Sequence, residues 1–221
     1  NIVPWQLLCE RAGATLRAVP IDDRGDLLMD DFARMLTPRT KLVAVTHQSN
    51  VLGTITPVGE IVALAHKVGA AVLVDGSQAA VHLPIDVRAI GAEFYVFTAH
   101  KLYGPMGVGV LYGREAALEA MPPFLGGGDM ISTVTFEGST WNELPHKFEA
   151  GTPNVAGAVG LGAAIDYVRR VGLGAIGAHE SALLARATAR LEGVSGLRIV
   201  GTARRKAGVV SALCWCGGLV L

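Results

Sequence analysis

The sequence predicts an α/β protein with a mostly parallel sheet covered by helices. Short apolar runs alternate along the chain with segments of helical periodicity, and polar residues collect where those runs end. Strands joined by helices of this length form parallel crossovers in one sheet. Hydrophobic residues make up 51% of the 221 residues and charged residues 17%. The chain can therefore build a sizeable core, and disorder is not expected.

The first half of the chain contains four candidate strands. They are KLVAVTH (41–47), AAVLVD (70–75), EFYVFTAH (93–100) and VGVLYG (108–113). The first is almost wholly apolar, as expected of a strand buried on both faces. After it, Thr56 can cap a helix that has Pro57 at its first position, and Gly69 can end that helix. The opening segment NIVPWQLLCERAG also reads as a helix, with Cys9 in the core.

The second half begins with a loop and continues into helices. PPFLGGGDMISTV (122–134) is rich in Gly and Pro and is expected to be a loop. Asn154 begins a helix lined with Gly and Ala, residues 176–191 form an amphipathic helix, and LRIVG (197–201) forms a strand. The stretch Gly172–Gly177 fits the G-x-G-x-x-G dinucleotide pattern. That pattern requires a preceding strand, whereas this stretch follows a helix, so it is a turn between two helices.

Composition and charge argue against several kinds of partner. Nineteen basic and nineteen acidic side chains cancel, and no run of Lys or Arg could follow a phosphate backbone, so nucleic acid is not expected. The charge-free stretch 207–221 has 15 residues, whereas a membrane-spanning helix needs about 20. Three cysteines are too few for a disulfide framework and indicate a cytoplasmic protein. The pair Cys214 and Cys216 has no matching histidines, so no metal site is expected.

Polar side chains gather at the ends of the candidate strands. They are His47, Ser49, Asn50, Asp75, Gln78, Thr98, His100 and Lys101. In open parallel sheets, ligands bind at the carboxyl ends of the strands, so these residues form the candidate site. The sequence assigns no role to His47.

Lys101 and Asp75 carry the chemistry that such a site could perform. Lys101 directly follows a buried strand, so its amine is partly desolvated and available in neutral form to make a Schiff base. A lone lysine in a loop would more often be a surface residue. Asp75 could hold a protonated pyridine nitrogen, because two charges ~4 Å apart at an effective dielectric of about 20 attract by about 4 kcal/mol. On its own, Asp75 could equally cap a helix.

Four strings of sequence resemble one family of enzymes. They are HQSNVLGT (47–54), VDGSQAAVHLPIDV (74–87), FYVFTAHKLYGPMGVGVLY (94–112) and FEAGTPN (148–154). Together they resemble class-V aminotransferase-fold enzymes, which are fold-type-I enzymes that use pyridoxal 5'-phosphate (PLP). They look most like the SufS-type (group II) cysteine desulfurases. The opening NIVPWQ and the loop GGGDMI are similar to the same group, and the resemblance covers about residues 1–211.

The resemblance implies a role for each candidate residue. Lys101 would bind PLP covalently and later move protons, and Asp75 would pair with the pyridine nitrogen. The other implied contacts are those of Asn50 and Gln78 to the ring oxygen, and those of Thr98, His100 and, from the other subunit, Thr152 to the phosphate. A homodimer is therefore implied.

The implied reaction removes sulfur from L-cysteine and gives L-alanine and a persulfide on the enzyme. The sulfur would then pass to an acceptor protein of iron–sulfur cluster assembly. The alternatives are selenocysteine lyase activity with L-selenocysteine, another lyase or aminotransferase reaction of the family, or a non-catalytic remnant. All the enzymatic alternatives share Lys101 and Asp75, so these residues cannot separate them.

The resemblance also divides the chain in two. Residues 1–175 would be most of a PLP-binding large domain, and residues 176–221 a connecting helix and the truncated start of a small C-terminal domain. A histidine that stacks on the ring is expected before the first residue. A persulfide cysteine and a carboxylate-binding arginine are expected after Ser211, where the resemblance ends; the cysteines there have no basic neighbour to activate them. We therefore expect little or no activity from this chain alone.

Overall fold

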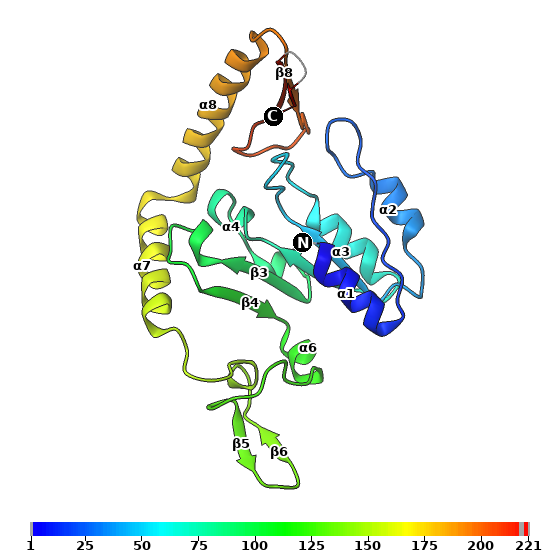
Figure 1. Ribbon diagram of the computed structural model, residues 1–221, viewed down its shortest axis with the longest axis vertical. Coiled ribbons are helices and arrows are strands. Elements are labelled where there is room, and N and C mark those ends of the chain that lie inside the picture. The colour runs from blue at the N-terminus through cyan, green and yellow to red at the C-terminus, as the bar shows by residue number, and fades with distance from the viewer. Residues whose placement is uncertain (1, 217–218, 221) are drawn as a thin grey trace.

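A four-stranded sheet lies at the centre of the protein, whose computed structural model describes residues 2–216 and 219–220 (Figure 1). The strands are, in spatial order, β1 (Leu42–Thr46), β2 (Ala71–Asp75), β3 (Phe94–Thr98) and β4 (Gly109–Gly113). The first three run parallel, and β4 runs antiparallel to β3. The predicted mostly parallel sheet is confirmed. The last strand reverses because only the short 3-10 helix η1 (Ala99–Lys101) and a turn separate it from β3, whereas a parallel crossover needs about a dozen residues.

Two helices pack against one face of this sheet, α3 (Val58–His66) and the short α5 (Val87–Ile90). Val72 and Val74 of β2 and Ala65 of α3 have no exposed surface in this layer. Burial of a valine side chain stabilises a fold by about 1.5–3 kcal/mol. This apolar layer therefore holds the strands whose ends carry the candidate residues.

The opposite face of the sheet is less buried than the sequence predicts. Residues of β2 alternate between buried and half-buried, and β1 contains no fully buried residue. Ala44 is exposed and Leu73 is half-buried. The prediction that the 41–47 strand is buried on both faces is therefore wrong for the described residues, because α3 covers only the face of Val72 and Val74.

The start of α3 also differs from the prediction. Pro57, and not Thr56, precedes its first residue, and no side chain caps the helix. Thr56 is instead buried, and its backbone N–H donates to the carbonyl oxygen of His47. Thr56 thus closes the turn after β1 through its backbone. Gly69, with φ +75°, ends the turn after the helix as predicted.

A second apolar cluster lies among α4 (Ala79–His82), η1 and the long helix α7 (Val155–Val171). Its buried members are Val81, Ala99, Leu102, Leu161 and Val168. Because two of these residues flank Lys101 in sequence, the cluster fixes the turn that follows β3.

The helix α7 begins and ends as predicted. The side-chain oxygen of Asn154 accepts a hydrogen bond from the backbone N–H of Gly157 and caps the helix. Gly172, with φ +87°, separates α7 from α8 (Leu173–Glu192). Only Gly172 of the G-x-G-x-x-G stretch lies at this junction; Gly174 and Gly177 belong to α8, so the turn predicted over 172–177 is wrong beyond Gly172. The stretch still follows a helix and not a strand, so it does not fit a dinucleotide site.

The remaining elements surround these layers. They are α1 (Ile2–Ala12), α2 (Met29–Met35), α6 (Glu115–Ala120), the hairpin of β5 (Ile131–Val134) and β6 (Ser139–Trp141), η2 (His146–Phe148), β7 (Leu197–Val200), β8 (Ser211–Cys216) and β9 (Leu219–Val220). The hairpin projects from the body at one end of the molecule, and β8 lies at the other (Figure 1). Two predictions are wrong here. Part of the expected loop 122–134 pairs as β5, and Cys9 is half-buried on α1, a helix without buried residues.

Candidate active site

Asp75 and Thr98 share one face of the sheet at its carboxyl edge. Asp75 ends β2 and lies opposite Val96, two residues before Thr98 ends β3. Because side chains alternate along a strand, Asp75 and Thr98 point to the same face. Strands about 4.8 Å apart with a rise of about 3.3 Å per residue put the two Cα atoms roughly 8 Å apart. The sheet therefore brings together two predicted site residues.

The residue that follows Asp75 has to be glycine. A Cβ atom on Gly76 would lie 2.1 Å from ring atoms of Tyr95. The backbone therefore turns closely over that ring. Within this turn the backbone N–H of Ser77 donates to Oδ1 of Asp75 at 2.9 Å. The hydrogen bond orients the Asp75 carboxylate at the edge of the sheet.

His47 and Tyr95 form a buried pair at the same edge. Nδ1 of His47 lies 3.0 Å from the phenolic oxygen of Tyr95. Burial lowers the pKa of His47, with the positive charge of Arg205 as the second cause. Burial, followed by the negative charge of Asp75, raises the pKa of Tyr95. Near pH 7 the imidazole is therefore neutral and the phenol protonated, which gives His47 the packing role that the sequence left open.

Thr98 and His100 form a second hydrogen-bonded pair, with 2.7 Å between Oγ1 and Nδ1. If Nδ1 carries the hydrogen, the threonine hydroxyl remains available to donate elsewhere. If the hydroxyl donates to Nδ1, the hydrogen of the neutral imidazole is on Nε2, which can then donate. In either arrangement the pair offers a hydrogen-bond donor to an anion such as phosphate.

Lys101 is held in place by buried neighbours. Ala99 is fully buried and Leu102 is 8% exposed. The backbone N–H groups of Leu102 and Gly104 both donate to the carbonyl oxygen of Ala99 and close a tight turn. Tyr103 lies in this turn with φ 59°, an uncommon conformation for a residue other than glycine. The half-buried Lys101 thus emerges directly after the strand that carries Thr98.

Gln78 is joined through a histidine to helix α8. Its Nε2 lies 3.3 Å from Nε2 of His82, and Nδ1 of His82 lies 2.7 Å from Oε2 of Glu180. His82 ends the short helix α4, one turn after Gln78. The sequence predicts no role for Glu180, and no local pattern could pair it with His82, because 98 residues separate them.

Asn50 lies beyond β1, in a turn that Ser49 closes. Oγ of Ser49 accepts hydrogen bonds from the backbone N–H groups of Val51 and Leu52, at 3.2 Å and 3.0 Å. Asn50 itself is exposed. Because β1 pairs with β2, this turn leaves the sheet at the edge where Asp75 lies.

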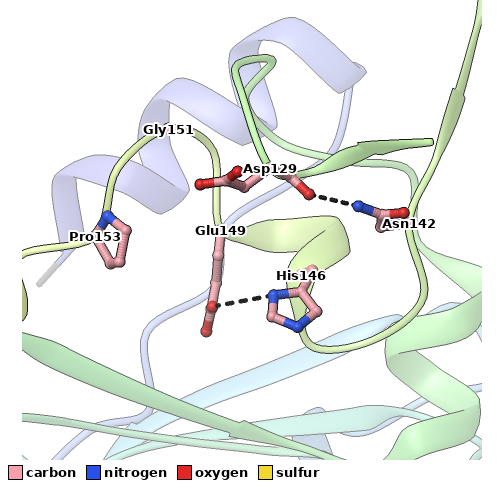
Figure 2. Close-up of a pocket in the computed structure, with 6 residues that line it drawn as sticks. All are labelled: Asp129, Asn142, His146, Glu149, Gly151 and Pro153. Carbon is pink, nitrogen blue, oxygen red and sulfur yellow. Dashed lines mark hydrogen bonds and ion pairs between the residues drawn. The ribbon is translucent and has the colours of Figure 1, made fainter. Parts of the chain in front are cut away.

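Thr152 lies beside a cavity near the hairpin of β5 and β6. A cavity of about 320 Å³ opens near the hairpin (Figure 2). It is lined by Asp129, Asn142, His146, Glu149, Gly151 and Pro153. The exposed Thr152 stands between the last two of these residues. Thr152 thus lies next to this cavity, and two residues further on Nδ2 of Asn154 donates to the carbonyl oxygen of Gly107, in the loop that follows Lys101.

Three further features concern the described residues: a second cavity, metal ligands and membrane-spanning helices. A second cavity, of about 380 Å³, is lined by residues of segments 22–29 and 54–57 together with Arg204 and Arg205. Among the residues described, no three His, Cys, Asp or Glu side chains are grouped as metal ligands. A search of the same residues found no helix with the length and apolar character that crossing a membrane requires.

Comparison with protein families and curated proteins gives consistent matches. A family model described as aminotransferase class-V matches residues 1–214. Probable cysteine desulfurase 1 of Mycobacterium leprae (strain TN) is 57% identical over 211 residues, which are 96% of this chain and 34% of that protein. Cysteine desulfurase of Klebsiella pneumoniae (strain 342) is 53% identical over 212 residues, which are 96% of this chain and 52% of that protein. The chain thus spans about a third to a half of the length of these relatives.

Solved structures match the fold over nearly the whole chain. The cysteine desulfurase CsdA from Escherichia coli has a TM-score of 0.91 at 37% identity, with 96% of this chain and 53% of that chain covered. The apo cysteine desulfurase from Thermococcus onnurineus NA1 has a TM-score of 0.91 at 38% identity, with 99% and 54% covered. The cystine C-S lyase C-DES, in complex with its reaction product cysteine persulfide, has a TM-score of 0.85 at 29% identity, with 96% and 58% covered.

Proposed function

The chain belongs to the class-V aminotransferase family, and from this premise we propose that it is the cofactor-binding part of a PLP-dependent cysteine desulfurase of the SufS type. Two curated relatives and two of the solved structures compared above carry the name cysteine desulfurase. The observation that carries the proposal is the edge of the sheet. There, two adjacent strands end in the carboxylate of Asp75 and the hydrogen-bonded pair of Thr98 and His100, followed directly by Lys101.

The residues at this edge fit PLP. A protonated ring nitrogen needs a carboxylate, and Asp75 provides one in an orientation fixed by the N–H of Ser77. A phosphate needs donors, and the pair of Thr98 and His100 keeps one in either tautomer. A solved structure of a C-DES lysine variant holds glycine covalently linked to the PLP cofactor. We infer that a lysine of this fold normally attaches the cofactor, and that in this chain Lys101, directly after β3, would do so.

Each residue then has a task that its position allows. When bound, PLP supplies an electron sink for bond changes at the substrate. Asp75 would hold the ring nitrogen in its protonated form. Lys101 would attach the cofactor through Nζ and afterwards move a proton at the substrate Cα. Gln78 and Asn50 would donate hydrogen bonds to the ring oxygen.

The substrate and partners follow from the same assignment. L-cysteine would give L-alanine, and its sulfur would pass through a persulfide to an acceptor protein of iron–sulfur cluster assembly in the cytoplasm. Thr152, beside the hairpin, would contact the phosphate held by a second copy of the chain, so the working unit would be a homodimer. The exposed position of Thr152 beside the cavity near the hairpin supports this contact across a dimer.

Titration with PLP and then with L-cysteine tests the assignment. We expect a visible absorbance band from bound PLP that changes on addition of L-cysteine, and neither signal in Lys101→Ala. Little or no alanine is expected from this chain alone, so the change of the band, and not alanine release, tests the substrate. PLP binding without any response to L-cysteine would contradict the proposed substrate, and no binding at all would contradict the cofactor.

A further inference from the structure

Three polar side chains connect the sheet edge to helix α8. Gln78 lies before α4, His82 ends α4, and Glu180 belongs to α8. The contacts are 3.3 Å between Nε2 of Gln78 and Nε2 of His82, and 2.7 Å between Nδ1 of His82 and Oε2 of Glu180. The side chains of His82 and Glu180 are 14% and 23% exposed, so water competes little for these bonds.

The carboxylate of Glu180 sets the direction of the hydrogen bonds from His82 to Glu180 and from Gln78 to His82. An ionised carboxylate only accepts, so the 2.7 Å contact places a hydrogen on Nδ1 of His82. In the neutral imidazole, Nε2 is then an acceptor, and the amide of Gln78 has to present an N–H to it. Glu180 therefore decides which end of the Gln78 amide faces His82.

We propose that Glu180 and His82 are positioning residues that hold the Gln78 amide with its nitrogen, and not its oxygen, available to the cofactor ring. This inference rests on the proposed function, because it concerns the contact of Gln78 with the ring oxygen of PLP. With one N–H bound to His82, the second N–H of the same group can serve the ring oxygen. A half-turn of the amide would put its carbonyl oxygen there and replace attraction by repulsion.

The charge of Glu180 also acts on the turn that carries Lys101. Burial, followed by the negative charge of Glu180, raises the pKa of Tyr103. Tyr103 lies two residues after Lys101 and packs edge-on against Tyr167 of α7, with 5.8 Å between ring centroids. Glu180 thus contacts His82, which holds Gln78, and its charge reaches Tyr103 in the turn of Lys101.

Nitrogen NMR of the ligand-free chain tests the direction of the hydrogen bonds without any cofactor. We expect the neutral His82 ring to carry its hydrogen on Nδ1. The same measurement on Glu180→Gln should show both tautomers, because a glutamine amide can donate as well as accept. A hydrogen on Nε2 of His82 in the unsubstituted chain would overturn the proposal, whether or not PLP binds.

Cofactor binding tests the consequence. Glu180→Gln should weaken PLP binding about fivefold, the value of one hydrogen bond, and should shift the pH midpoint of the visible band of bound PLP. The matched control is Glu192→Gln, which removes the same charge from an exposed position at the end of α8. Equal affinities and midpoints for the two variants would overturn the positioning role. Absence of PLP binding in the unsubstituted chain would instead refute the proposed function and leave the NMR result to decide the direction of the hydrogen bonds.

Discussion

The sheet edge and the hairpin segment before Thr152 differ in how the protein holds them. Beneath the edge, Val72 and Val74 have no exposed surface. On the hairpin, Phe136 is fully exposed and Trp141 is 46% exposed. Both regions carry residues proposed to meet PLP, yet on the hairpin the side chains of Val134, Phe136 and Trp141 are exposed, and the buried Met130 lies at its base.

This difference separates residues that the fold of one chain positions from a residue that we propose needs a second copy of the chain. Asp75 and Thr98 end strands that pack on the core, and Lys101 follows one of them, so the energy that stabilises the core also fixes their geometry. Thr152 is exposed, between two residues that line the cavity near the hairpin. We therefore expect the first group to be in place before any ligand or partner binds, and Thr152 to act only in the dimer.

The largest expected contrast comes from two glycines. Gly76→Ala would push a Cβ atom to 2.1 Å from the ring of Tyr95, and overpacking of this kind costs about 3 kcal/mol. Gly138→Ala in the hairpin meets nothing within 4 Å and should stay within about 0.5 kcal/mol. Urea unfolding measures both. Equal stabilities of the two variants would show that the turn after Asp75 is not tightly packed.

The next contrast removes apolar surface from each region. Val74→Ala should lower the free energy of unfolding by about 2 kcal/mol, because it leaves a cavity in the layer beneath α3. Phe136→Ala removes a larger side chain that is already exposed, so its effect should be below about 0.5 kcal/mol. If Phe136→Ala cost more than Val74→Ala in urea unfolding, the hairpin would be held by contacts that the structure does not show.

A third contrast concerns the cofactor. Thr98→Val keeps the shape of the side chain but removes its hydroxyl, so PLP should bind roughly tenfold more weakly through loss of one charge-assisted hydrogen bond. Thr152→Ala should have a similar effect at protein concentrations where the chain is dimeric and no effect where it is monomeric. Absorbance titration with PLP at several protein concentrations measures both. A concentration-independent loss for Thr152→Ala would contradict the contact across a dimer.

The smallest expected effect is a pH dependence that originates at the sheet edge. Burial lowers the pKa of His47 below its unfolded value of 6.5. Above that value the ring is neutral in both states. As the pH falls below it, the unfolded chain takes up a proton that the folded chain does not, so stability decreases. Between about pH 7.5 and about pH 5.5, His47→Gln should therefore lose less stability in urea unfolding than the unsubstituted chain. An identical loss in both would exclude His47 as the cause.

The sequence predicts the strands of the sheet better than it predicts burial and long-range pairing. Strong apolar runs locate β1 to β4, and the residues at or just after their ends include Asp75, Thr98 and Lys101. The antiparallel β4 depends on the length of one connection, and the half-buried face of β1 depends on which helices pack there. Neither property is encoded in the periodicity of a single strand.

The contacts that the sequence could not predict join distant residues. His47 pairs with Tyr95, and His82 pairs with Glu180 on α8. A buried histidine and a surface histidine look alike in sequence, because only the folded chain decides which polar group faces each ring nitrogen. The cavity beside Thr152 likewise appears only once the hairpin has formed.

Mass spectrometry after borohydride reduction tests the central claim most directly. The chain is incubated with PLP, reduced, digested and searched for the lysine that carries the reduced cofactor. We expect the label on Lys101 alone. The variant Asp75→Asn, treated in the same way at low PLP, should carry no label, because asparagine cannot hold the ring nitrogen as a cation. Label on Lys41, Lys67, Lys147 or Lys206 in preference to Lys101, or on no lysine, would contradict the account.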